Sequence, residues 1–222
     1  MSGAWSASGE LAPCELALKD GRRAALRLAT LQDAADLWEL DRAVHLDGRG
    51  VVLTLDELPA TLDEQRARLE RFPSNLSGAA VVVELEDHAV ALAQVRRYNL
   101  RMLSHVARFD LAVHPRAQGL GAGRAAMEAA LGWARAVSPP VLRAELNVLA
   151  DNPRAIQLYR SLGFEVEGVR RAFVRRAAHR GLRGPAPLAR RPHRDGPPRP
   201  ARHLGRRAGF DVPEDLGHHG GP

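Results

Sequence analysis

The sequence of 222 residues lacks most features that would place it in a specialised class of protein. Cys14 is its only cysteine, so a disulfide framework within the chain is excluded, and a cytoplasmic location is the expectation. No apolar run approaches the ~20 residues that a membrane-spanning helix needs. Residues 1–10 have no cationic start followed by an apolar stretch, so we expect neither a signal peptide nor a membrane partner.

Lysine is almost absent too, because Lys19 is the only one in the chain. The net charge of +6 is unevenly placed, since residues 177–222 hold nine arginines against four acidic residues. The remainder of the chain is nearly neutral and gives no electrostatic argument for binding nucleic acid. The basic segment contains one aromatic residue, Phe210, so base stacking has little support and we expect no nucleic-acid partner.

What the chain does contain is a pattern of alternating strands and helices with 45% apolar residues, enough for one core. Apolar alternation and turn residues predict strands at residues 24–30, 79–85, 89–98, 104–113, 141–148 and 164–174. Capping residues and helical periodicity predict helices at residues 34–40, 58–72, 119–136 and 153–163. This order predicts an α/β fold with a mixed sheet and helices on its faces.

Three segments differ in composition. We expect residues 1–23 to be a flexible leader and residues 24–176 to be the folded domain. Residues 177–222 are rich in Arg, Pro and Gly, and their apolar surface is too small to offset the entropy of ordering. We therefore expect this tail to be disordered.

The segment with most chemical information is LAVHPRAQGLGAGRAA, residues 111–126. A predicted strand ends at Val113, and a glycine-rich turn then opens a predicted helix. Such a turn lets backbone N–H groups point at an anion, and the helix dipole adds positive charge. The spacing matches neither the dinucleotide-binding fingerprint nor the P-loop, which also needs a lysine.

The same segment resembles a signature of the GNAT acetyltransferases, [Q/R]-x-x-G-x-[G/A], with Gln118, Gly121 and Gly123 in register. A second motif of that family, N-x-x-A-x-x-L-Y-x-x-L-G-F, is similar to residues 152–164. The resemblance covers about residues 24–175 and is closest to the branch that acetylates free amino acids. It implies a GNAT-type mixed sheet, in which the Arg/Pro-rich tail takes the place of the usual final strand.

The resemblance also implies that acetyl-CoA is the co-substrate and that no metal is needed. Its pantetheine arm would pair with the strand before the turn, and its pyrophosphate would lie on the amides of the turn and the helix start. The cofactor-binding residues implied in this way are Leu111, Ala112, Val113, Gln118, Gly119, Leu120, Gly121, Ala122, Gly123, Arg124 and Asn152.

For catalysis, the resemblance assigns Tyr159 to protonation of the departing CoA thiolate, a role that suits a phenol with a pKa near ~10. Some relatives have a glutamate base where this chain has Asn147, which cannot act as a base. Glu145 lies two residues earlier on the same strand face and is one candidate, although a structural role suits it better. Asp110 is the second candidate, and deprotonation through water is the third.

The function implied is transfer of an acetyl group to a primary amine, with a free amino acid as the first choice of acceptor and a peptide N-terminus as the second. An alternative is an impaired GNAT-like domain that only binds acyl-CoA; a nucleic-acid binder that uses the basic tail is the least favoured. Relatives continue past about residue 175 with a turn and a final strand. We therefore favour a reading-frame change there over a native basic extension. An exposed sheet edge favours a homodimer.

Overall fold

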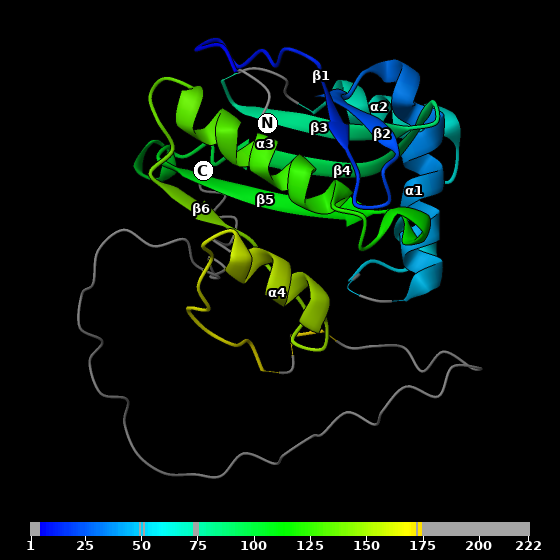
Figure 1. Ribbon diagram of the computed structural model, residues 1–222. Helices are drawn as coiled ribbons and strands as arrows, with labels where there is room; N and C mark the ends of the chain where they lie inside the picture. The colour runs from blue at the N-terminus through cyan, green and yellow to red at the C-terminus, as the bar shows by residue number, and fades with distance from the viewer. Residues whose placement is uncertain (1–4, 49, 51, 73–75, 172, 175–222) are drawn as a thin grey trace, which may run out of the picture.

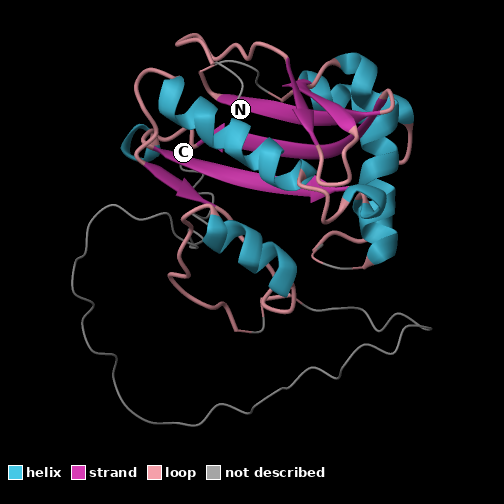
Figure 2. Ribbon diagram, in the orientation of Figure 1, coloured by secondary structure: helices cyan, strands magenta, loops and turns pink. Residues whose placement is uncertain are grey.

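The computed structural model describes residues 5–48, 50, 52–72, 76–171 and 173–174. They form one six-stranded mixed sheet with helices on both faces, which confirms the predicted fold class (Figures 1 and 2). The strands are β1 (Cys14–Ala17), β2 (Arg23–Leu28), β3 (Gly78–Leu85), β4 (His88–Arg97), β5 (Val106–Val113) and β6 (Arg143–Glu145). The helices are α1 (Ala34–Asp47), α2 (Leu62–Glu70), α3 (Ala122–Ala136) and α4 (Pro153–Ser161).

The strands lie in the sheet in the same order as in the chain. β1 to β5 are antiparallel to their neighbours, and β6 is parallel to β5. The β3–β4 hairpin turns at Glu86 and Asp87, whose φ angles are 54° and 63°. Two left-handed residues give the turn a twist that suits two adjacent antiparallel strands.

Each face of the sheet carries its own apolar core. α3 crosses one face, as Figure 1 shows, and that core contains Trp133 of α3 together with Phe109 of β5. Tyr159 and Phe164, from α4 and the residues after it, belong to the same core. The smaller core on the other face contains Leu37 and Leu40 of α1. Side chains alternate along a strand, so each residue of β4 and β5 is assigned to one face.

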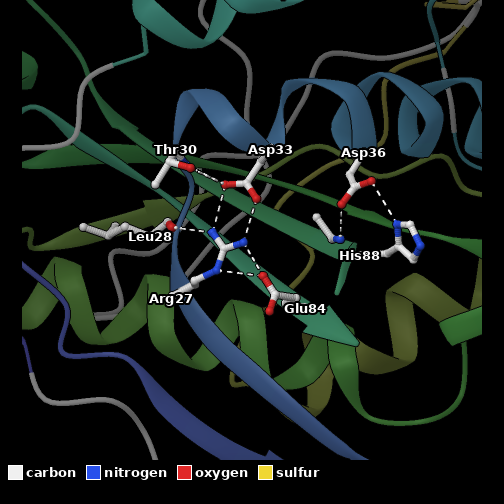
Figure 3. Close-up of polar contacts among 8 residues, drawn as sticks. Arg27, Leu28, Thr30, Asp33, Asp36, Glu84 and His88 are labelled. Atoms are coloured by element: carbon white, nitrogen blue, oxygen red, sulfur yellow. Dashed lines mark hydrogen bonds and ion pairs between the residues drawn. The ribbon is translucent and has the colours of Figure 1, made fainter. Parts of the chain in front are cut away.

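A buried ion cluster fixes the start of α1 to the sheet (Figure 3). The Arg27 guanidinium donates to both oxygens of Asp33, at 2.7 and 2.9 Å, and to Glu84 of β3. Asp33 is only 4% exposed. Burial alone would raise its pKa, but hydrogen bonds from Arg27 and Thr30 outweigh burial, and the pKa of Asp33 lies below its usual value. One turn further along the helix, Asp36 accepts hydrogen bonds from the Ala89 backbone and the His88 ring of β4.

Two sequence predictions are wrong. Residues 14–17, expected in a flexible leader, form β1, because Cys14, Leu16 and Leu18 alternate inward while Glu15 lies outward. The Trp5 ring nitrogen also donates to the Ala129 carbonyl of α3 at 2.9 Å, so residues before β1 contact the core as well. The strand expected at residues 164–174 is absent from the described residues.

The missing strand has a physical reason. Among the described strands, β6 lies at one edge of the sheet and is only three residues long, so it offers little backbone for a further strand to pair with. Alternating apolar residues do not form a strand without a partner, and Val166, Val169 and Phe173 lie exposed. The predictions for the tail, residues 177–222, fall outside the described residues.

Most remaining elements are confirmed with shifted ends. α2 begins at Leu62 rather than residue 58, and α3 begins at Ala122 rather than residue 119. β6 covers only the centre of the strand expected at residues 141–148. Within the described residues, no helix is long and apolar enough to cross a membrane.

Candidate active site

The glycine-rich turn lies between the end of β5 and the start of α3. Gly119 and Gly121 have φ angles of 85° and 99°, a conformation that other residues rarely adopt. A Cβ atom at Gly123 would lie 2.8 Å from Cγ2 of Val113, so only glycine fits there without displacing β5. The backbone of residues 118–124 therefore gathers at the N-terminus of a 15-residue helix, where the dipole favours an anion.

Side chains from other elements hold this turn in place. The amide nitrogen of Gln118 donates to the Val113 carbonyl at 3.3 Å, and its oxygen accepts from Arg154 of α4 at 3.0 Å. Arg124 donates to Ser161 of α4 and to Glu128. The predicted residues 118–124 thus lie together, and α4 is tied to them by two arginines. Arg154 is a neighbour that sequence reasoning missed.

A second residue missed from the sequence is Lys19, at the turn between β1 and β2. Its backbone nitrogen donates to the Leu120 carbonyl at 2.9 Å. Its Cγ lies 3.9 Å from the position that a Cβ atom would take at Gly121. The only lysine of the chain therefore lies beside the glycine-rich turn. The apolar alternation before Lys19 is the sequence signal that could have predicted the strand that precedes it.

β5 and β6 separate beyond a short paired stretch. The register joins Val106–Arg108 to Arg143–Glu145 and then ends. In Figure 1, β6 diverges from β5 and leads towards α4. The predicted residues Leu111, Ala112 and Val113 lie beyond the paired stretch and are half-buried. Their backbone on the β6 side faces this gap, where an extended ligand would find hydrogen-bonding groups.

Tyr159 lies in the core beside the gap, with 6% of its surface exposed. Its ring packs edge-on against Phe164, with centroids 5.9 Å apart. Burial raises the pKa of Tyr159 above its ordinary value, and the negative charge of Asp110 raises it further. Tyr159 belongs to the core under α3, whereas Asp110 is on the opposite face of β5.

Asn152 caps α4, because its side-chain oxygen accepts from the Ala155 nitrogen at 3.1 Å. Its amide nitrogen also lies against Gly50, where a Cβ atom would be 2.4 Å away. Gly50 has a φ of 83°, which suits glycine as well. Gly50 therefore lies directly beside the start of α4.

Glu145 is 6% exposed and already has partners for both carboxylate oxygens. The Tyr98 hydroxyl donates to one oxygen at 2.6 Å, and the Arg143 Nε donates to the other at 3.2 Å. Burial, together with this hydrogen bond, raises the pKa of Tyr98 to about 12. Arg143 in turn pairs with Glu167 at 2.6 Å, which lowers the pKa of Glu167. These contacts favour a structural role for Glu145.

Asp110 is the more open acid. The Asp110 side chain is 47% exposed, and it forms an ion pair with Arg108 at 3.8 Å. Of the two base candidates from the sequence, Asp110 influences Tyr159 by its charge, whereas Glu145 belongs to a separate network with Tyr98 and Arg143. Tyr98 and Arg143 were not predicted, because contacts between strands distant in sequence leave no local pattern.

A cavity of about 260 Å³ lies elsewhere, on the face covered by α1 and α2. Its walls come from the end of β2, the end of α2 and Ala80 of β3, and they include Phe72. It is therefore not the cradle formed by the glycine-rich turn. Among the described residues, no group of three or more His, Cys, Asp or Glu side chains is suited to hold a metal ion.

Comparison with known proteins agrees with the fold and the glycine-rich turn described above. The model of the acetyltransferase (GNAT) family matches residues 51–164. A GNAT-family acetyltransferase from Streptococcus pneumoniae is 25% identical with a TM-score of 0.60, and the match covers 65% of this chain and 86% of that one. A ribosomal-protein-alanine N-acetyltransferase from Brucella melitensis is 26% identical with a TM-score of 0.52, and the match covers 63% and 83% of the two chains.

A third similar structure, from Salmonella typhimurium, contains acetyl-CoA. It is 20% identical with a TM-score of 0.51, and the match covers 64% of this chain and 79% of that one. No curated protein sequence matches significantly. The matched region, residues 51–164, spans the glycine-rich turn, the gap beside β5 and Tyr159. This chain therefore belongs to the GNAT acetyltransferase family, whose co-substrate is acetyl-CoA.

Proposed function

We propose that the chain transfers the acetyl group of acetyl-CoA directly to the primary amine of a free amino acid. The observation that supports the proposal is the glycine-rich turn at the start of α3, followed by α4 with a phenol, Tyr159, whose pKa is raised by burial and by the charge of Asp110. In this proposal Tyr159 is the proton donor, and the exposed carboxylate of Asp110 is the proton acceptor. Transfer between an amine and a thioester needs both.

The glycine-rich turn suits the phosphates of the co-substrate, because Gly119 and Gly121 adopt left-handed conformations and the turn opens onto the N-terminus of α3, where the helix dipole favours an anion. In this proposal, the amides of residues 118–124 bind the pyrophosphate, and the free backbone of Leu111–Val113 pairs with the pantetheine arm. Asn152, at the start of α4, lies near the thiol end. Backbone N–H groups of β5 polarise the thioester carbonyl.

In the chemical step, the uncharged amine attacks the thioester carbonyl, a C–N bond forms, and the C–S bond breaks. Asp110, directly or through water, takes the proton that the amine loses. Tyr159 donates its phenolic proton to the departing thiolate, and its raised pKa keeps that proton in place until the thiolate forms.

The test is release of free CoA thiol with a panel of L-amino acids and short peptides. The chain has two tyrosines, Tyr98 and Tyr159, so the same substitution at each provides a matched pair of variants. We expect Tyr159→Phe to lower kcat about 100-fold or more. Tyr98→Phe removes a hydroxyl that binds Glu145 and should change kcat only a few-fold. Equal rates for Tyr159→Phe and wild type would contradict the assignment of Tyr159.

A second candidate function is an acyl-CoA-binding domain without transferase activity. Two observations favour it: Glu145 is engaged by Tyr98 and Arg143, and no strand follows β6 in the described residues. Acetyl-CoA binding without turnover for any amine would support this candidate. Turnover with peptides but not with free amino acids would identify a peptide N-terminus as the acceptor. The predicted homodimer is tested on the same sample by sedimentation equilibrium.

A further inference from the structure

Two arginines lie directly opposite each other near the proposed site. Arg96 of β4 pairs in register with Arg108 of β5. Residues opposite each other in an antiparallel pair have Cβ atoms about 5 Å apart, and like charges in such positions destabilise the sheet. Both side chains are exposed. The pair therefore costs stability, and an anion bound between the two guanidinium groups would offset that cost.

Both arginines are on the face of the sheet that α1 and α2 partly cover. Leu92 and Ala112 belong to the core on that face, and Arg96 and Arg108 follow or precede them by an even number of residues. Asp110 is on the same face, two residues from Arg108. The arginine pair therefore lies beside the acid that we assign as the base.

Within the described part of the chain, these two guanidinium groups have few carboxylate partners. Arg96 stacks on the ring of Phe72, 5.0 Å from its centroid, and has no carboxylate partner within the described part of the chain. Arg108 is 3.8 Å from Asp110, which is longer than a hydrogen bond. By contrast, Arg27 and Arg143 each bind carboxylates through several hydrogen bonds below 3.3 Å.

We propose that Arg96 and Arg108 form an anion subsite that binds the carboxylate of the acceptor. An amino acid places its amine and carboxylate on one carbon atom, and the subsite has an acid and two guanidinium groups at neighbouring positions. The amine would lie at Asp110 and the carboxylate at the arginine pair. Guanidinium groups bind carboxylates in a two-pronged manner. Stacking on Phe72 holds Arg96 in place before the acceptor arrives.

This inference rests on the proposed function, so its test separates the two. The first measurement is the ratio of kcat/KM for L-leucine to kcat/KM for L-leucinamide, which has the amine but lacks the carboxylate. Because the two amines differ in pKa, each rate is referred to its uncharged fraction. We expect wild type to prefer leucine at least tenfold, and Arg96→Gln and Arg108→Gln each to lower the ratio about tenfold.

Arg66→Gln is the matched control, because it removes the same charge from an exposed position on α2, where Arg66 pairs with Asp63. It should leave the ratio unchanged. Thermal unfolding of each variant shows that the fold is intact. A wild-type ratio near one, or a ratio that all three variants change alike, would overturn the subsite and leave the transferase function standing.

The second measurement does not need turnover. Calorimetry measures the affinity of the CoA-loaded protein for N-acetyl-L-leucine and for its amide. Carboxylate-dependent binding that Arg96→Gln and Arg108→Gln weaken tenfold would support the subsite even in a protein that releases no thiol, in which case the proposed function alone fails. Equal affinity for the acid and the amide would overturn the subsite.

Discussion

The two ends of the sheet differ in how completely their backbone and charged groups are paired within the protein. From β1 to β4, neighbouring strands are paired, both faces carry buried apolar side chains, and Arg27 has carboxylate partners on two sides. From β5 to β6, pairing ends after three residues, and Arg108 and Asp110 of β5 lie exposed. The first region, β1 to β4, is a structural platform. The second region, β5 to β6, leaves polar groups accessible to a ligand. Stability and binding are therefore separable by mutation.

The largest expected effect breaks the platform. Trp133 is fully buried against the sheet, so Trp133→Ala should lower the free energy of unfolding by about 3–5 kcal/mol. Leu142 is 75% exposed next to β6, and Leu142→Ala should cost less than about 0.5 kcal/mol. Urea denaturation of both variants checks the comparison. Similar losses at the two positions would mean that platform and edge do not differ as described.

A smaller effect concerns the ion cluster of the platform. Asp33→Asn removes the carboxylate that Arg27 binds and should cost about 2 kcal/mol at pH 7. Because the folded pKa of Asp33 is lowered, its stabilising effect is complete above the unfolded pKa of about 3.9 and is lost as pH falls through the lower folded value. The difference from wild type should therefore shrink below about pH 4.

The control for this pH dependence is Asp63→Asn, at a side chain that is 90% exposed. It should change the free energy of unfolding little at any pH, because exposed ion pairs contribute little. Unfolding curves between pH 3 and pH 7 make the measurement. A difference between wild type and Asp33→Asn that grows on acidification would contradict the lowered pKa.

The next prediction addresses the open region. Gly123→Ala would place a Cβ atom 2.8 Å from Val113 and force α3 and β5 apart, so acetyl-CoA affinity should fall about tenfold. Gly132→Ala is the control on the same helix, since its Cβ atom would meet Trp5 at 3.0 Å, far along α3 from the turn. It should alter stability without altering affinity. Calorimetric titration with acetyl-CoA distinguishes these outcomes.

The smallest effect is expected at Lys19. If its ammonium group contacts a phosphate of CoA, Lys19→Met should weaken binding about threefold at low salt, the size typical of an exposed ion pair. Lys19→Arg keeps the charge and should bind as wild type does. The difference should vanish in high salt. A loss that is the same at every salt concentration would indicate that Lys19 acts by packing rather than by charge.

Local signals explain what the sequence could predict. The glycine spacing of residues 119–123, the Asn152 cap and the two-residue turn at Glu86 and Asp87 each depend on a few neighbouring residues. Such features need no knowledge of distant partners. The glycine-rich turn, both halves of the β3–β4 hairpin and α4 were therefore predicted close to their observed positions.

What was missed depends on partners far along the chain. β1 is a strand because β2 lies beside it, and the described part of residues 164–174 forms no strand, because β6 offers only three residues for pairing. The engagement of Glu145 by Tyr98 and the opposition of Arg96 and Arg108 follow from strand register. Register is set by the whole sheet, so no window of the sequence contains it.

The agreement between chain order and strand order has a consequence for the way the protein forms. β3, β4 and β5 are joined by short connections, so their pairing closes small loops, whereas β6 joins β5 only after the crossover through α3. Contacts that close small loops form early in folding. On a ribosome, β1 to β5 would already have emerged before α4 is synthesised, so the substrate site is the last part to assemble. Amide hydrogens of β3 and β4 should accordingly exchange slowest and those around α4 fastest.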